Sequence, residues 1–176
     1  MGEYLPSPLG LLTLAAFLED KKENLEIEVL DCQAEKVDWK GLKEMISSFL
    51  PDIVAPSALS TCNAYTTARA CELAKKIDPE IKTVVGGQHF SATAQESLQI
   101  YPEIDFIIRG EGEQSFYELI RGIEKSENLT NTKGISYRKD GAIIHSQARP
   151  FINNLDELPF PGYNFIEKNL KKYHLH

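Results

Sequence analysis

The sequence lacks the patterns that mark the common catalytic and cofactor-binding sites. It has three cysteines, Cys32, Cys62 and Cys71, and no CxxC pair, which excludes a disulfide framework. There is no GxGxxG turn, no GxxxxGK followed by Ser or Thr, and no GxSxG elbow, so a dinucleotide fingerprint, a phosphate loop and a hydrolase triad are unsupported. His89 and His145 have no partner at metal-ligand spacing, and we predict no metal bound by this chain itself.

Long apolar runs and clustered positive charge are also absent. The longest apolar run, residues 9–18, is too short to cross a bilayer and has neither a basic flank nor a cleavage site. Lys and Arg number 19 against 26 Asp and Glu, and the resulting net charge of −7 argues against a nucleic-acid partner. We therefore expect a cytoplasmic chain with reduced thiols and no membrane span.

What the sequence does have is a regular alternation of amphipathic helices and short apolar strands. Helices are expected at residues 9–18, 38–49, 63–77 and 93–100 and after residue 113, and strands at 25–30, 52–55, 81–85 and 104–108. Ser7 is expected to cap the first helix, with Pro8 at the first helical position. The alternation predicts a doubly wound α/β fold of the flavodoxin or Rossmann type, with a mainly parallel sheet covered on both faces.

The pattern changes in the last third of the chain. Residues 134–138 and 142–145 flank an Asp-Gly pair, which is a strong signal for a tight hairpin turn. A proline-bearing connector follows. We therefore expect an α/β domain at 1–126, a β-hairpin appendage at 127–150 and a connector at 151–176.

Three loops that leave the carboxyl ends of predicted strands carry small and polar residues, and ligands bind at this edge of open α/β sheets. We expect a polar small-molecule cofactor to bind to these residues: Ser57, Leu59, Ser60, Thr61, Gly86, Gly87, His89, Gly110, Glu111 and Gly112. Each loop also has an ordinary explanation. The hydroxyls can be helix caps, the glycine pair can serve a sharp turn, and the glutamates can favour the positive end of the next helix.

These motifs, taken in order, resemble those of a known family. The run PLGLLTLAAFL at residues 8–18 resembles the opening of cobalamin-dependent radical SAM proteins. PDIV at 51–54, VGGQH at 85–89, GEGE at 110–113 and LDELPFP at 155–161 follow in the family's order. The magnesium-protoporphyrin IX monomethyl ester oxidative cyclases carry the same series, so the resemblance covers nearly the whole chain.

The resemblance implies a cobalamin-binding domain, whose general pattern is DxHxxG, then SxL, then a glycine pair. Asp31 is kept, but Gln33 stands where the cobalt-binding histidine would be, and Lys36 replaces the glycine. Residues 57–59 match SxL, which implies that Ser57 hydrogen-bonds the nucleotide tail. Because an amide is a poor cobalt ligand, we predict that cobalamin binds without histidine ligation.

Two features of the family are missing from these 176 residues. The CxxxCxxC run that binds an iron–sulfur cluster and S-adenosylmethionine is absent, so the resemblance implies a downstream radical SAM domain as partner, and we expect the chain to be a fragment that is not catalytic by itself. The family's opening strand is also absent. We expect either direct pairing of the strands at 25–30 and 52–55 or completion by another chain, as in a homodimer.

Three functions remain open at this point. The first is the cobalamin-binding domain of a radical SAM oxidoreductase or methyltransferase, such as a tetrapyrrole oxidative cyclase. The second is a domain that keeps this fold without the cofactor and serves as an interaction or substrate platform for the catalytic domain. The third is an unrelated small α/β enzyme, but no nucleophile is paired with a base.

Overall fold

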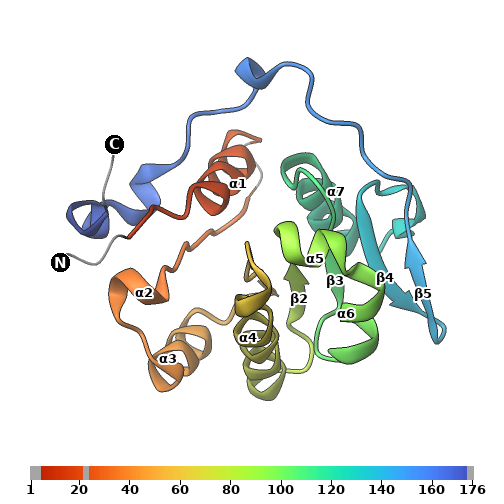
Figure 1. Ribbon diagram of the computed structural model, residues 1–176, viewed down its shortest axis with the longest axis horizontal. Coiled ribbons are helices and arrows are strands. Elements are labelled where there is room, and N and C mark those ends of the chain that lie inside the picture. The colour runs from red at the N-terminus through yellow and green to blue at the C-terminus, as the bar shows by residue number, and fades with distance from the viewer. Residues whose placement is uncertain (1–4, 22–23, 174–176) are drawn as a thin grey trace. The chain divides into compact units, whose positions relative to one another are not determined.

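A computed structural model describes residues 5–21 and 24–173 of the chain, which divides into two compact units. The terminal unit combines residues up to 44 with those from 153 onward, and the sheet unit comprises residues 45–152. Figure 1 traces the elements of both. Each unit is described by itself.

The sheet unit is built on five strands whose spatial order equals their order in the chain. They are β1 (Ile53–Val54), β2 (Lys82–Val85), β3 (Phe106–Ile108), β4 (Ile135–Lys139) and β5 (Ala142–His145). The pairs β1–β2 and β2–β3 are parallel, whereas β3–β4 and β4–β5 are antiparallel. The expected α/β class is therefore confirmed. The sheet is mixed rather than mainly parallel, because the hairpin pairs with β3 and extends the sheet.

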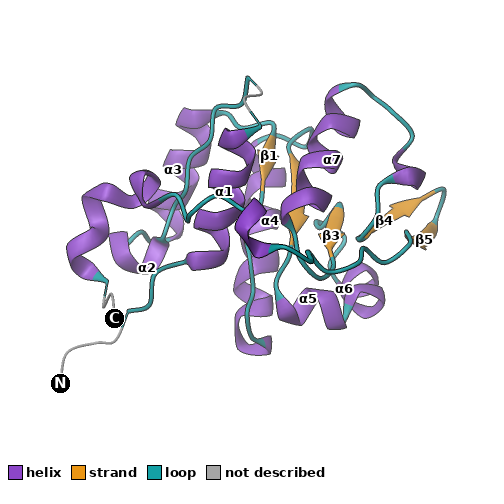
Figure 2. Cartoon of the chain, turned by 90° about the horizontal axis from the view of Figure 1, so that it is seen from above, coloured by secondary structure: helices purple, strands orange, loops and turns teal. Residues whose placement is uncertain are grey.

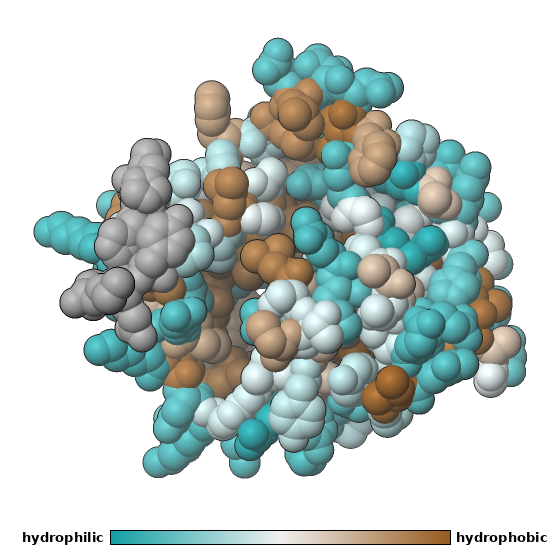
Figure 3. All heavy atoms as spheres, viewed as in Figure 1, coloured by the Kyte–Doolittle hydropathy of each residue, from teal (hydrophilic) through white to brown (hydrophobic). Residues whose placement is uncertain are grey.

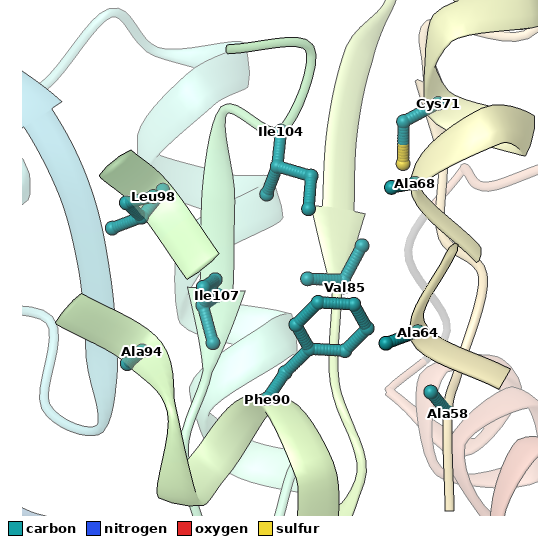
Figure 4. Close-up of a cluster of buried hydrophobic side chains, with 10 residues drawn as sticks. All are labelled: Ala58, Ala64, Ala68, Cys71, Val85, Phe90, Ala94, Leu98, Ile104 and Ile107. Carbon is teal, nitrogen blue, oxygen red and sulfur yellow. The ribbon is translucent and has the colours of Figure 1, made fainter. Parts of the chain in front are cut away.

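Helices cover both faces of this sheet, as Figure 2 shows for α5 (Gln88–Ala92) and α6 (Ala94–Ile100) on one side and α7 (Glu113–Glu124) on the other. Successive strand residues point to opposite faces, which explains the division of the core. Val85 packs in one cluster with residues of α5, α6 and α4 (Ala64–Ile77), and Val84 packs in another with residues of α7. In Figure 4, Phe90 reaches from α5 past Val85 toward Ala64 on α4.

The predicted hairpin is confirmed, with Asp140 at φ +50° and Gly141 at φ +78° in its turn. Positive φ at both central residues is what a two-residue turn of type I′ requires. Arg138 on β4 fixes the hairpin to the segment between α6 and β3. Its guanidinium donates hydrogen bonds to the carbonyls of Leu98 at 2.6 Å and Pro102 at 2.8 Å, and also to that of Ile104.

The terminal unit contains α1 (Leu9–Asp20), α2 (Cys32–Glu35) and two 3-10 helices, η3 (Leu155–Glu157) and η4 (Tyr163–Lys172). Helix α3 (Trp39–Phe49) runs from this unit into the sheet unit. One cluster of buried hydrophobic residues in the terminal unit consists of Leu12, Ala34, Ile166 and Tyr173. The Gly162 N–H donates to the Leu12 carbonyl at 3.1 Å, so the two distant parts of the chain are joined through backbone as well as side chains.

The helices expected from apolar periodicity are all present, as α1, α3, α4, α6 and α7. The short helices α2 and α5 were not expected, nor were the 3-10 turns η1 (Thr61–Asn63) and η2 (Leu129–Asn131). Within residues 5–21 and 24–173, no helix combines the length and the apolar character needed to span a membrane.

Two local predictions are wrong. Residues 25–30 form no strand, and among the described residues β1 pairs with β2 alone, so the expected direct pairing does not occur. Alternating apolar residues give a segment one apolar face, but a strand also needs a hydrogen-bonding neighbour. Ser7 does not cap α1, because Pro8 takes the capping position and the helix begins at Leu9 without a side-chain cap. Completion of the sheet by another chain stays a prediction, as do the domain boundaries at 126 and 150.

Candidate functional site

The three loops singled out in the sequence are contiguous at the carboxyl ends of β1, β2 and β3. Ser57 forms a parallel β-bridge with Gly86, and the Ala58 N–H donates to the Gly86 carbonyl at 3.1 Å. The third loop is joined to the second through α5, because the Gly110 N–H donates to the Ser91 hydroxyl at 3.1 Å. The sheet therefore gathers the predicted loops into one surface within a single unit.

Gly87 allows the first two loops to approach each other closely. Its backbone has φ +93° and ψ 176°, a region that is essentially restricted to glycine. A Cβ at this position would lie 2.4 Å from the Ala58 carbonyl oxygen and 3.0 Å from the Ser57 Oγ. The glycine is thus needed for more than a sharp turn, because it places the Ser57 loop against the backbone of the second loop.

The polar side chains of the first loop are not used as helix caps. Ser60 precedes η1 and Asn63 precedes α4, and neither side chain accepts a capping hydrogen bond. The Ser60 hydroxyl lies 3.0 Å from the Cys62 Sγ instead. Ser57 and Thr61 are exposed, and their hydroxyls have no hydrogen bond within the part of the chain that the structure describes. Capping therefore does not explain these residues.

Two further residues of the predicted site, Leu59 and His89, differ in how far their side chains are exposed to solvent. Leu59 is 74% exposed, an unusual state for a large apolar side chain inside a polar loop. His89 lies on α5 and is partly buried, with its ring edge-on to Phe90 at 5.1 Å between centroids. The Thr93 hydroxyl donates to the His89 carbonyl at 2.9 Å and lies 3.5 Å from the His89 Nε2.

The third loop both starts α7 and contacts the backbone of Ile152. Gly110 adopts φ +75°, and the Gly112 carbonyl accepts the first backbone hydrogen bond of α7, from Phe116 at 2.7 Å. The Glu111 carboxylate accepts a hydrogen bond from the Ile152 N–H at 2.6 Å. Glu113 begins α7, and its Oε2 is buried without a partner among the described residues. Buried acceptors are normally satisfied, so this oxygen marks a place where a donor is missing.

In the terminal unit, the carboxylate of Asp31 is hydrogen-bonded by the chain itself. The Asp31 Oδ1 accepts hydrogen bonds from the backbone N–H groups of Gln33 and Ala34, both at 3.0 Å, and caps α2. Its Oδ2 accepts from the Tyr173 hydroxyl at 3.0 Å. Burial, reinforced by the Asp31 carboxylate, raises the pKa of Tyr173 above its ordinary value. Gln33 is exposed.

Sequence reasoning missed Ser91, which joins the second and third loops, and Ile152, the partner of Glu111. Ser91 carries no local signal beyond its place after VGGQH. Ile152 is separated from Glu111 by 41 residues, and its contribution is a backbone N–H, which no side-chain motif reveals.

The sequence is similar to a known domain family and to several characterised and uncharacterised proteins. The family model described as the B12 binding domain matches residues 3–120. An uncharacterised methyltransferase of Pyrococcus horikoshii is 34% identical over 161 residues, which are 90% of this chain and 34% of that protein. The anaerobic magnesium-protoporphyrin IX monomethyl ester cyclase of Rubrivivax gelatinosus is 30% identical over 146 residues, 81% of this chain and 26% of that protein. The chain thus spans about a quarter to a third of the length of these relatives.

Solved structures share the fold. The cobalamin-dependent S-adenosylmethionine radical enzyme OxsB, with aqua-cobalamin and S-adenosylmethionine bound, superposes with a TM-score of 0.80 at 21% identity, over 96% of this chain and 23% of that one. The radical S-adenosylmethionine methyltransferase TsrM of Kitasatospora setae, with cobalamin and a [4Fe-4S] cluster bound, gives 0.70 at 19% identity, over 89% of this chain and 29% of that one. At these identities the likeness concerns the fold.

Proposed function

The chain belongs to the B12-binding domain family, homologous to the amino-terminal domains of radical SAM methyltransferases and anaerobic magnesium-protoporphyrin cyclases, and on that premise we propose that it binds cobalamin as the cofactor domain of a radical SAM enzyme. The observation that carries the proposal is the contiguous surface of the three loops, whose hydroxyls in the first loop are exposed and not used as caps. Such groups are suited to a large ligand with polar substituents.

The residues present fit this ligand. Cobalamin offers carboxamides, a phosphate-linked nucleotide tail and an apolar corrin ring, and the loops offer hydroxyl donors, bare glycine backbone and an exposed Leu59. We propose that the following residues contact cobalamin: Ser57, Leu59, Ser60, Thr61, Gly86, Gly87, His89, Gly110 and Gly112. When bound, cobalamin would supply methyl-carrying cobalt chemistry to the parent protein.

Cobalamin is further proposed to bind without a histidine from this chain on cobalt. Gln33 stands at the ligand position, and an amide is a poor ligand for cobalt. A metal-bound histidine usually donates its other ring N–H to a carboxylate or carbonyl. The Asp31 carboxylate already accepts three hydrogen bonds from its own chain. This position therefore lacks a histidine, and the carboxylate that could support one is already occupied.

A titration of the 176-residue chain with hydroxocobalamin tests the binding. We expect saturable binding, which the substitution Ser57→Leu abolishes by removing the exposed hydroxyl and placing a bulky apolar side chain on the proposed site. Ser47→Leu on α3 introduces the same side chain at another exposed serine and should leave the affinity within about twofold, because a surface change away from the ligand has little effect. Equal affinities of the two variants would contradict the placement of the site.

The absorbance spectrum of the bound cofactor tests the ligation. We expect a cobalamin spectrum without histidine coordination, unchanged between the wild type and Gln33→Ala. A histidine-ligated spectrum of the wild type would contradict this part of the proposal while leaving the binding itself intact.

A second candidate is a domain that keeps the fold but acts as an interaction or substrate platform without cofactor. The replacement of the histidine by Gln33 and the engagement of Asp31 by Tyr173 favour it. A folded chain that shows no saturable cobalamin binding at millimolar concentration would establish this alternative over the first.

The parent protein is proposed to carry an iron–sulfur cluster and S-adenosylmethionine in a domain beyond the connector, and to act as an oxidoreductase or methyltransferase. Support comes from the share of the relatives that this chain spans, 26–34% of their length. Iron analysis of the longer protein, compared with that of the 176-residue chain, tests the assignment, since only the former should bind a cluster.

A further inference from the structure

The chain segment after the hairpin, residues 149–152, is fixed to α7 by side-chain contacts; we call this segment the strap. The Arg149 Nε donates to the Ser115 Oγ at 2.8 Å, and its guanidinium pairs with the Glu118 carboxylate. Ser115 is fully buried, and the Arg149 side chain is 16% exposed. Gln114 holds the other oxygen of Glu118 at 3.0 Å, so the carboxylate is oriented from two sides.

A second anchor lies three residues further on, where the Ile152 N–H donates to the Glu111 Oε2 at 2.6 Å. Hydrogen bonds to an ionised acceptor are about twice as strong as neutral ones. The segment before the strap is also tied down, since the Gln147 carbonyl accepts from the Gly134 N–H at 2.8 Å and the Ser146 carbonyl accepts from the Arg109 guanidinium at 2.5 Å. The backbone is thus held from the end of β5 to Ile152.

Neither anchor is needed to complete a secondary-structure element. Both lie beyond the last strand, and Glu111 belongs to the loop between β3 and α7 that the sequence suggested for the cofactor. Ordering the mostly buried Arg149 side chain and the Glu111 carboxylate costs conformational entropy. A loose linker would not need this cost, because nothing in it has to be held in place. Their joint effect is to fix where the connector leaves the sheet unit.

We propose that Glu111 and Arg149 are positioning residues, which hold the start of the connector against α7 beside the third cofactor loop. The chain therefore leaves the sheet unit from a fixed point beside the third loop, which is proposed to contact the cofactor. This use of the strap depends on the proposed function, whereas the two anchors, which together we call the clamp, do not. Glu111 is accordingly assigned to the connector and not to cobalamin.

Amide hydrogen exchange at Ile152, measured by NMR on the 176-residue chain without cofactor, tests the clamp. In Glu111→Ala we expect exchange at this amide to speed up by about tenfold to a hundredfold, the range for loss of a charged hydrogen bond. Glu111→Gln keeps an acceptor without the charge and should show a smaller acceleration. Glu124→Gln, on an exposed glutamate at the far end of α7, is the matched control and should change nothing.

Arg149→Met supplies an independent variant, because it keeps the apolar stem and removes the donors. We expect faster cleavage by chymotrypsin after Phe151, which is 77% exposed but held between the two anchors. Wild-type exchange at Ile152 in Glu111→Ala, or wild-type cleavage in Arg149→Met, would overturn the proposal.

Hydroxocobalamin titration of the same variants separates the two possible roles of Glu111. A positioning role predicts unchanged affinity together with faster exchange. Weaker cobalamin binding with a still-protected Ile152 amide would make Glu111 a cofactor ligand and refute the assignment. If no variant and no wild type bound cobalamin, the proposed function would fail, while the exchange experiment would still decide on the clamp.

Discussion

Replacing Gly87 by alanine should destabilise the sheet unit strongly, because the added methyl group causes both backbone strain and a steric clash. The backbone conformation at φ +93° and ψ 176° costs a non-glycine residue about 1–3 kcal/mol. The added Cβ would also lie 2.4 Å from the Ala58 carbonyl oxygen and 2.9 Å from its carbon, which are backbone atoms that cannot rotate away. Overpacking of this kind adds about 1–3 kcal/mol.

The total, about 2–6 kcal/mol, is a large fraction of the roughly 5–15 kcal/mol that stabilises a typical domain. Urea unfolding followed by far-UV circular dichroism measures it, and with a slope of about 2 kcal/mol per molar urea the midpoint should fall by about 1–3 M. Gly141→Ala is the matched control, since Gly141 has φ +78° but no atom within 4 Å of an added Cβ. It should cost about 1–2 kcal/mol, the left-handed penalty alone.

The comparison refutes the reasoning if Gly87→Ala is no more destabilising than Gly141→Ala. In that case the contact between the first and second loops would be soft, and the glycine would serve the turn only. A large loss confined to Gly87→Ala would instead show that the Ser57 loop is held rigidly against the second loop before any ligand binds.

Three further outcomes are expected. Burial raises the pKa of the Cys71 thiol to about 12. An alkylating reagent at pH about 8 should therefore label the exposed Cys62 first and react with Cys71 only on unfolding. Equal labelling rates of the two thiols would contradict this. Because the pKa of Tyr173 is raised from 10.0 in the folded state, its contribution to stability is complete below pH 10 and declines above it, and Tyr173→Phe should flatten that decline in alkaline unfolding curves. Arg138→Met should cost about 2–4 kcal/mol in urea unfolding, since it leaves three backbone carbonyls without their donor, and a loss below about 1 kcal/mol would show that water replaces it.

Much of the fold could be predicted because its determinants are local. Each determinant affects only residues close to it in the chain. Examples are the Asp140–Gly141 turn, the apolar stripe of α7, and the proline and glycines that bound β2. The segment at 25–30 shows the limit of such reasoning. Its alternation specifies which side chains share a face, but whether it becomes a strand depends on a neighbouring strand that the pattern does not contain.

The sequence predicts which loops form the candidate site, but it does not predict what each residue of those loops contacts. Small and polar residues after strands indicated where a ligand would bind, and the structure joins those loops as expected. That Glu111 contacts the Ile152 backbone could not be inferred, because a carboxylate in a glycine-rich loop is equally suited to a ligand, a helix end or a distant amide. The choice among these is made by tertiary structure alone.

Apolar side chains open to solvent also escape prediction from composition. On the face seen in Figure 3 they interrupt a mostly hydrophilic surface. The exposed large apolar side chains include two of the connector motif, Leu155 at 66% and Phe160 at 95% exposed. Their sequence alone reads as an ordinary proline-bearing linker, and only the fold shows that these side chains are left outside the core of their own unit.

The sheet order β1-β2-β3-β4-β5 has a consequence for how the sheet unit is synthesised and folds. Every described strand pairs with the strand that immediately precedes it in the chain, so each loop is closed over a short sequence separation before the next strand emerges. Pairing with the preceding strand keeps the contact order lower than it would be in a sheet whose order skips a strand. The sheet can therefore grow at one edge as the chain leaves the ribosome, and no strand of this unit has to be inserted between two that are already paired.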